Sequence, residues 1–227
     1  MRIALFSATL LVSSLATAAT AIDGLYSSLY GGYSYLPDNI RQFHRGVFFD
    51  NVSYHNGYNA GLRFGFQSHP LRYEGELTFI NAKANTFRLR QFFNQPFPNR
   101  YVSGQAYAAF AMANVYYDFF EIIPCISPFL GVGLGYGWIE TTVNIKNYYF
   151  LNYSFLYSSS EYRFRGADSA FAYQGTAGLT FNFSENYALN VAYRYIGTTK
   201  INQLGKNFQT NLASVGVVYR FDEYKYK

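Results

Sequence analysis

A strict alternation of apolar and polar side chains runs through residues 171–221 of the chain. In one stretch, the apolar positions are Tyr187, Leu189, Val191, Tyr193 and Tyr195, and the positions between them are Ala188, Asn190, Ala192 and Arg194. In a second stretch, Val215, Val217, Tyr219 and Phe221 are opposed by Ser214, Gly216 and Arg220. Successive side chains of a β-strand point to opposite faces, so this period predicts long strands with one apolar and one polar face.

Eight such strands are expected, with connections that alternate between short and long. The strands are placed at 24–36, 57–67, 71–84, 104–119, 127–143, 169–182, 186–197 and 209–221. The short connections are 68–70, 120–126 and 183–185, and the long ones are 37–56, 85–103, 144–168 and 198–208. Short turns on one side and long loops on the other are typical of outer-membrane barrels. The sequence therefore predicts an all-β fold, an eight-stranded antiparallel up-and-down transmembrane β-barrel with external loops and both termini in the periplasm.

The N-terminus predicts export. Met1-Arg2 is a short positive region, residues 3–15 are mostly apolar, and Ala19-Thr20-Ala21 offers a cleavage site for a signal peptide. We therefore expect a signal peptide over 1–21 and a barrel domain over 22–227, with cleavage after Ala18 as the alternative. An uncleaved anchor is disfavoured because roughly 13 residues are too few to span a bilayer. The expected location is the outer membrane of a Gram-negative bacterium.

The composition fits a lipid-facing surface. The chain has 24 Tyr and 23 Phe, and only 14% of its residues are charged. Aromatic side chains with a polar tip are typical of the girdles at membrane interfaces. The parity of the strands accordingly assigns tyrosines and valines to lipid, and arginines and glutamates to the interior.

The inward parity collects polar and charged side chains. The expected network contains Arg63, Glu74, Glu76, Asn114, Asp118, Gln174, Asn190, Arg194 and Arg220, together with Asn182. An eight-stranded interior is just wide enough to be filled by side chains. Three arginines facing three acids predict a self-neutralising structural plug, and a gated ion path is the alternative.

The strand over 127–143 has glycine at every second position from Gly131 to Gly137. A phosphate-binding loop is excluded because the spacing is not G-x-G-x-x-G and no helix pattern follows. We expect these glycines to make room for Phe110, Met112 and Tyr116 of the preceding strand.

Enzymatic and metal chemistry have little support in the sequence. Glu74 and Glu76 share a face, as general acid/base work requires, but a filled lumen leaves no room for a substrate. His44, His55 and His69 have no partners at metal-ligand spacing. We expect no enzyme, no metal and no cofactor. A lipid-modifying outer-membrane enzyme and an exported soluble ligand-binding barrel, lipocalin-like with its apolar parity inward, are the alternatives.

The long loops carry arginine beside aromatic residues. The contact candidates are Arg41, Arg45, Arg88, Arg90, Arg100, Arg163 and Arg165. This chemistry suits protein or glycan partners and anionic lipopolysaccharide. Solvated loops, or loops that lean on the membrane, are the alternative. Nucleic-acid binding is not expected, because the basic residues are dispersed and exported.

Four segments resemble a known family. They are the run PFLGVGLGYGW at 128–138, FAYQGTAGL at 171–179, NVAYRYIG at 190–197 and NVYYDF at 114–119. Together they are similar to strands of the opacity-type and surface-antigen outer-membrane proteins, which belong with the membrane domain of the outer-membrane protein A family. The resemblance covers most strands but not the loops. It implies a surface-exposed barrel, placed by the barrel-assembly machinery in outer-membrane lipid and used in adhesion, host interaction, immune exposure or envelope integrity.

The chain departs from that family in two ways. No peptidoglycan-binding domain follows the barrel, so an anchoring role is not expected. Six residues follow Phe221, although barrels of this kind usually end on an aromatic residue that the assembly machinery recognises. We expect either Phe221 or Tyr226 to serve as that signal.

Overall fold

The computed structural model describes residues 23–36, 40–44, 47–54, 57–90, 100–121, 125–150, 157–200 and 207–221. The predicted signal peptide over 1–21 and the residues after Phe221 lie outside this part of the chain. Among the described residues, no helix is long and apolar enough to cross a membrane.

The described residues form β-strands joined by turns and loops. The strands are β1 (Gly24–Tyr35), β2 (Ile40–His44), β3 (Val47–Tyr54), β4 (Gly57–Ser68), β5 (Leu71–Arg90), β6 (Arg100–Asp118), β7 (Ile126–Phe150), β8 (Tyr157–Asn182), β9 (Tyr187–Lys200) and β10 (Asn207–Arg220).

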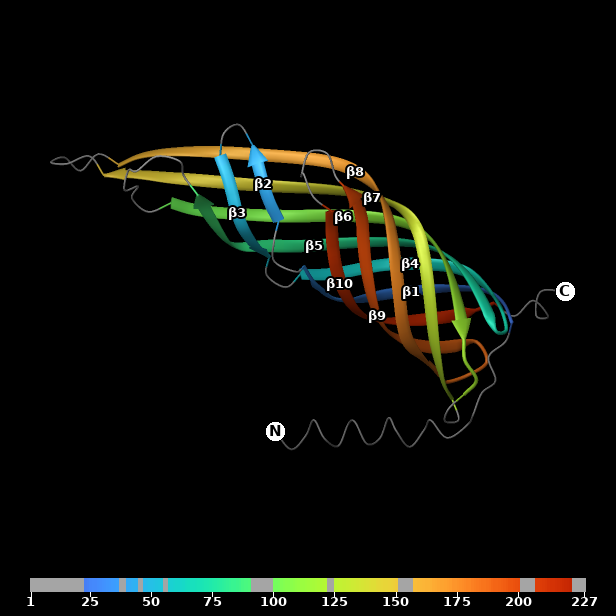
Figure 1. Cartoon of the computed structure of the whole chain (residues 1–227). Helices are drawn as coiled ribbons and strands as arrows, with labels where there is room; N and C mark the ends of the chain where they lie inside the picture. The colour runs from blue at the N-terminus through green and yellow to red at the C-terminus, as the bar shows by residue number, and fades with distance from the viewer. Residues whose placement is uncertain are drawn as a thin grey trace, which may run out of the picture.

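Eight of these strands close into an antiparallel barrel (Figure 1). The ring runs β5-β4-β1-β10-β9-β8-β7-β6, and the pairing of β5 with β6 closes it. Each strand pairs with its neighbours along the chain, apart from the β2–β3 hairpin inserted between β1 and β4. The predicted fold class, an eight-stranded up-and-down barrel, is confirmed. We call the end with the short connections the turn end, and the opposite end the loop end.

The segments predicted to be external loops are largely strand, and this corrects the expected boundaries. β7 pairs with β8 from Ile126–Phe181 to Phe150–Tyr157, whereas β8 pairs with β9 only as far as Ala172–Thr198. β5 runs to Arg90, and the segment over 37–56 contains the β2–β3 hairpin, which pairs with that extension of β5. The backbone of a long connection needs hydrogen-bond partners, and continuing the ladder supplies them.

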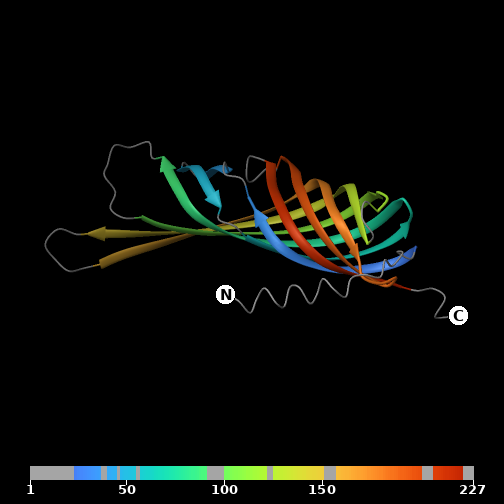
Figure 2. The same ribbon diagram turned by 90° about the horizontal axis from the view of Figure 1, so that it is seen from below.

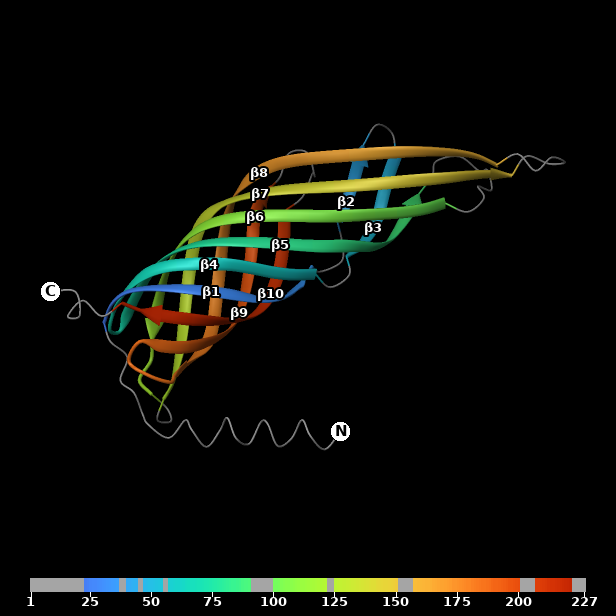
Figure 3. The same cartoon turned by 180° about the vertical axis from the view of Figure 1, so that it is seen from behind.

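The extensions form a sheet beyond the barrel. The extensions of β6, β7 and β8 pair with one another, and β5 pairs with β6 only as far as Ala84–Gly104. Beyond that point β5 pairs with β3, which pairs with β2. Figures 1 and 3 show the extensions of β6, β7 and β8 as a ramp that rises from one side of the barrel, and Figure 2 shows that the end of β5, with β2 and β3 beside it, turns away from this ramp. We call these extensions, together with the β2–β3 hairpin, the external sheet. Within 198–208, β9 extends to Lys200 and β10 begins at Asn207.

The two faces of the barrel wall differ as the alternation predicts. Leu29 is 71% exposed and Val132 is 69% exposed, whereas Arg194 has no exposed surface. A soluble ligand-binding barrel would have its apolar face inside, so the arrangement is the reverse of that alternative. Two tyrosines correct the parity assignment, because Tyr26 and Tyr30 are buried inside rather than facing lipid.

The interior changes character along the barrel axis. Its loop-end half holds an apolar layer among a few buried polar side chains such as Ser34 and Thr210. The layer is made of Leu36, Ile80, Ala82, Ala106, Ala108, Phe110, Met112, Ile139, Ala170, Ala172, Ile196, Phe208 and Leu212. Within it, the rings of Phe110 and Phe208 lie 5.9 Å apart between centroids. The centre and the turn end are polar. The sequence did not predict this division.

The glycines of β7 make room for large side chains of β6, as expected. A Cβ on Gly131 would lie 2.1 Å from Cδ1 of Tyr116, and one on Gly137 would lie 2.3 Å from Cε1 of Phe110. These distances are far inside van der Waals contact. The bare backbone of β7 is therefore a requirement of the packed interior.

Candidate functional site

A buried carboxylate, Glu76 of β5, is the centre of the polar interior. Its oxygens accept hydrogen bonds from Tyr30 Oη at 2.9 Å, Thr78 Oγ1 at 2.6 Å and Arg63 Nε at 3.0 Å. Asn114 Nδ2 donates at 3.3 Å, and Arg194 Nη1 also donates to it. A carboxylate out of water needs this many donors because each lone pair left without a partner is costly.

The pair of Glu76 with Arg194 crosses the barrel. Arg194 lies on β9, which is four strands from β5 in either direction around the ring. Neither side chain has exposed surface. The guanidinium of Arg194 also donates to Ser214 Oγ at 3.0 Å and lies 4.3 Å from the centroid of the Tyr30 ring. Side chains from opposite walls therefore meet at the barrel axis.

The Tyr30 ring lies between two guanidinium groups. Arg63 lies 4.2 Å from its centroid and Arg194 lies 4.3 Å from it. A cation over an aromatic face gains electrostatic attraction that grows when the pair is desolvated. This gives a physical reason for a tyrosine at this inward position, which shares the parity of the buried Ser28 and Ser34.

A second cluster lies toward the turn end around Arg72, a residue that the sequence prediction omitted. Its Nη1 lies 3.2 Å from Glu74 Oε1 and its Nε lies 3.2 Å from Asp118 Oδ2. Tyr26 donates a hydrogen bond to Glu74. Arg72 shares the parity of Glu74 and Glu76, so the alternation contained the signal that would have found it.

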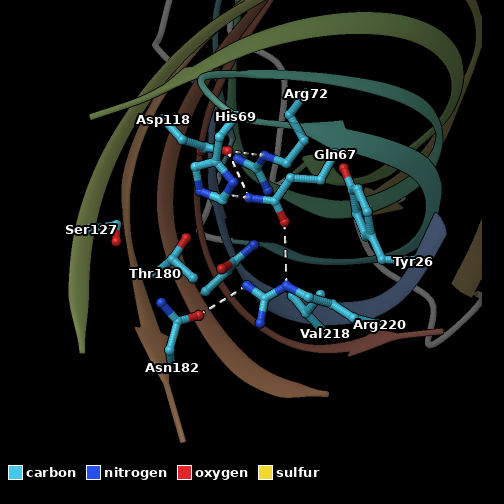
Figure 4. Close-up of a pocket in the computed structure, with 11 residues that line it drawn as sticks. Tyr26, Gln67, His69, Arg72, Asp118, Ser127, Thr180, Asn182, Val218 and Arg220 are labelled. Carbon is cyan, nitrogen blue, oxygen red and sulfur yellow. Dashed lines mark hydrogen bonds and ion pairs between the residues drawn. The ribbon is translucent and has the colours of Figure 1, made fainter. Parts of the chain in front are cut away.

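The last part of the network lies at the turn end itself (Figure 4). Gln67 donates to Asp118 Oδ2 at 3.2 Å and accepts from Arg220 Nε at 3.2 Å. Arg220 Nη2 donates to Asn182 Oδ1 at 2.9 Å. A small polar pocket lies among these side chains, with His69 at its edge.

The predicted network residues all lie on the buried side of the wall. Gln174 donates to Asn114 Oδ1 at 2.6 Å, which links β8 to the Glu76 cluster. Asn190 is buried, and no partner of its Oδ1 lies among the described residues. The charge balance differs from the expected three against three. Within the described barrel lumen there are four arginines, Arg63, Arg72, Arg194 and Arg220, and three acids, Glu74, Glu76 and Asp118; the fourth buried acid, Glu140, lies outside it and pairs with Arg165.

The predicted contact arginines lie in and around the external sheet. Arg41, Arg88, Arg90 and Arg100 belong to its strands, but their side chains are outside the described part, as is the whole of Arg45. Arg163 and Arg165 are exposed on β8, beyond the point where β8 leaves β9. The structure therefore places two of the seven side chains, both facing solvent.

Arg165 has a carboxylate partner on the neighbouring strand. Its Nη2 donates to Glu140 Oε2 at 3.0 Å, and its Nε donates to the other oxygen. Hydrogen bonding from Arg165 holds the pKa of the Glu140 carboxyl below its ordinary value. With 67% of the Arg165 side chain exposed, solvent screens this pair.

The three acids of the barrel lumen each contact a guanidinium, and Glu74 and Glu76 therefore serve as acceptors for arginine in this structure. No group of three or more potential metal ligands occurs within the described ranges. The polar interior is a hydrogen-bonded network that joins opposite walls.

Comparisons with known proteins agree with the fold. Residues 4–221 match the family described as outer membrane protein beta-barrel domain. An outer membrane protein of Gluconacetobacter diazotrophicus is 28% identical over 218 residues, which cover 87% of this chain and 53% of the relative. The chain thus spans about half the length of that curated relative.

Two solved structures are similar at lower identity. Neisserial surface protein A aligns with a TM-score of 0.55 and 18% identity, over 87% of this chain and 97% of that chain. Ail, the attachment invasion locus protein of Yersinia pestis, aligns with a TM-score of 0.41 and 19% identity, over 88% of this chain and 100% of that chain. The family match, with an apolar outer wall around a polar interior, leads to one conclusion: the chain belongs to the outer membrane protein beta-barrel domain family of Gram-negative bacteria.

Proposed function

We propose that this protein is a closed, non-conducting barrel that presents its external sheet to anionic molecules at the cell surface. The observation that carries the proposal is the ion pair between Glu76 and Arg194, which joins opposite walls at the barrel axis with no exposed surface on either side chain. Because side chains fill the lumen, a partner molecule cannot enter it. A partner must therefore bind to the surface outside the barrel.

The apolar layer at the loop end supports the same conclusion. Phe110 and Phe208 are 1% and 3% exposed, and they lie in the path of any solute that entered from that end. An ion passing this layer would exchange its hydration shell for a mostly apolar lining with few polar side chains, which is unfavourable. The interior thus has an apolar barrier in series with a charged one.

The external sheet supplies the surface for a partner. Arg163 and Arg165 are exposed on β8; Arg165 donates two of its five N–H groups to Glu140, which leaves three for a further acceptor. Exposed guanidinium groups bind phosphate and sulfate bidentately. The partners that we propose for these arginine side chains are the phosphates of lipopolysaccharide and anionic host glycans. We also propose that β10 and Phe221 present the signal that the barrel-assembly machinery recognises.

Conductance tests the closed lumen. Planar-bilayer recordings of the purified protein should show no steady openings of nanosiemens size. Steady openings of that size would overturn the proposal of a structural plug and favour an ion path.

Binding tests the role of the external sheet. The double variant Arg163→Gln with Arg165→Gln should bind lipopolysaccharide and sulfated glycans more weakly than the unmodified protein, and the difference should grow at low ionic strength. Arg163→Lys with Arg165→Lys keeps the charge and serves as the matched control. Equal binding by the glutamine variant and the lysine control would refute the role of these two residues.

A lipid-modifying enzyme is the remaining alternative, and we propose a non-enzymatic role instead. The proposal rests on the engagement of all three acids of the barrel lumen by arginine and on comparisons that name outer-membrane barrels. Overproduction should leave the phospholipid and lipid A profiles of the cell unchanged. A new lipid species that depends on the protein would contradict this.

A further inference from the structure

Arg220 is a buried guanidinium that forms no ion pair with a buried carboxylate of the described residues. It is 3% exposed, and among the described residues no Asp or Glu oxygen forms an ion pair with it. Its acceptors are all neutral: Gln67 Oε1 at 3.2 Å, Asn182 Oδ1 at 2.9 Å and the backbone oxygen of Glu185 at 3.4 Å. A guanidinium has five N–H donors, so two remain for a further acceptor.

The other three arginines of the interior already share all three acids of the barrel lumen. Arg63 and Arg194 contact Glu76, and Arg72 contacts Glu74 and Asp118. The described interior therefore carries one positive charge more than its carboxylates neutralise. An uncompensated charge away from water costs several kcal/mol, so a counter-charge at Arg220 is strongly favoured.

The pocket beside Arg220 has the chemistry and the size for such a counter-charge. It is lined by Arg220, Arg72, Gln67, His69, Asn182 and Asp118 (Figure 4). Nη2 of Arg72 is buried, and no acceptor for it lies among the described residues. The one carboxylate in the lining, Asp118, already forms an ion pair with Arg72 at 3.2 Å and accepts a hydrogen bond from Gln67 at 3.2 Å.

The cavity measures about 10 Å³, which is room for about one water-sized particle. A phosphate ester or a sugar acid exceeds this space, so the pocket admits at most a monatomic anion. We propose that the turn-end pocket binds a single halide ion, chloride under ordinary conditions, held by Arg220 and the neighbouring donors and stabilising the barrel.

Anion-specific stability tests the site. The midpoint of the heat-dependent gel-mobility shift is measured for the purified, folded barrel in sodium chloride and in sodium gluconate at equal ionic strength. Gluconate is too large for the pocket. Chloride should raise the midpoint with saturation, by about 3–6 °C when it reaches ten times its dissociation constant.

Two variants make the result specific. Arg220→Gln should lose the difference between chloride and gluconate, while Arg220→Lys, which keeps the charge, should retain part of it. Crystals soaked in bromide should give an anomalous peak beside Arg220, a measurement that needs no variant. Equal midpoints in the two salts for the unmodified protein, or a chloride effect that persists in Arg220→Gln, would overturn the proposal.

The chain itself offers a second source of negative charge in Asp222 and Glu223, which follow Arg220 closely in the sequence. The variant Asp222→Asn with Glu223→Gln separates the two sources. A chloride effect of unchanged size in this variant supports the halide site. An effect that appears only after these two acids are neutralised would assign the counter-charge to the chain and contradict the proposal.

Discussion

Substitution of the central carboxylate, Glu76, tests whether water enters the lumen and screens its charges. Glu76→Gln keeps the shape of the side chain and removes its charge. Arg63 and Arg194 then remain buried with one ion-pair partner fewer, and the excess of positive charge in the interior grows. The substitution therefore probes electrostatics with little change in packing.

The expected magnitude follows from the geometry. Arg63 Nε lies 3.0 Å from Glu76 Oε2, with 3% and 0% of the two side chains exposed. Unit charges at this separation attract by about 5.5 kcal/mol at an effective dielectric constant of about 20, and by about 1.4 kcal/mol in bulk water. Removing one partner of a buried pair typically costs about 3–5 kcal/mol. We expect Glu76→Gln to lower the free energy of unfolding by that amount.

The assay is reversible urea unfolding of the barrel in lipid vesicles, followed by tryptophan fluorescence. Arg165→Gln is the matched control, because it also neutralises one member of an ion pair but in the solvent-exposed external sheet. It should leave the unfolding midpoint unchanged. A loss below about 1 kcal/mol for Glu76→Gln would mean that water screens the lumen, and it would refute both the dry network and the closed barrel that depends on it.

Three further predictions use the same unfolding assay. Arg194→Met should lower the free energy of unfolding by about 1.5–3 kcal/mol, which is less than for Glu76→Gln because Arg63 still pairs with the carboxylate. It should create no steady conductance in planar bilayers, and an open channel would contradict the apolar barrier. Gly137→Ala should lower the free energy of unfolding by about 1–3 kcal/mol, because its methyl group would collide with the Phe110 ring. The control Gly175→Ala should be nearly neutral, because no atom lies within 4 Å of the added methyl group, and equal effects of the two substitutions would argue against the packed interior. Val132→Arg should cost about 2–4 kcal/mol in vesicles if this outward position faces the bilayer core, and an unchanged stability would refute that placement.

Some misses in the site prediction were avoidable and others were not. Arg72 could have been found, since it lies two residues before Glu74 on the same parity. Tyr26 and Tyr30 could not be assigned from parity alone, because tyrosine suits both a membrane interface and a hydrogen-bonded interior. Their burial depends on Glu74 and Glu76, whose carboxylates accept from the phenol groups.

The length of the strands beyond the barrel was also underestimated. Val143 and Ile145 alternate with Asn144 and Lys146, so the local pattern continues past the predicted strand end. Local alternation cannot tell where a strand loses its second neighbour, because that depends on the stagger between adjacent strands. Pairing of β8 with β9 ends at Ala172, and this event sets the boundary between barrel and external sheet.

The sequence by itself determined the strands, their apolar and polar faces and the fold class, because alternation is a local property that lipid on one side and a filled interior on the other impose on every strand. The tertiary structure alone decided which inward side chains meet. Glu76 and Arg194 are separated by 118 positions in the chain and come together only when β5 and β9 close on opposite sides of the ring. That closure also sets the apolar layer at the loop end and leaves Arg220 beside neutral partners, because the register and stagger of eight strands determine which side chains share each level of the barrel.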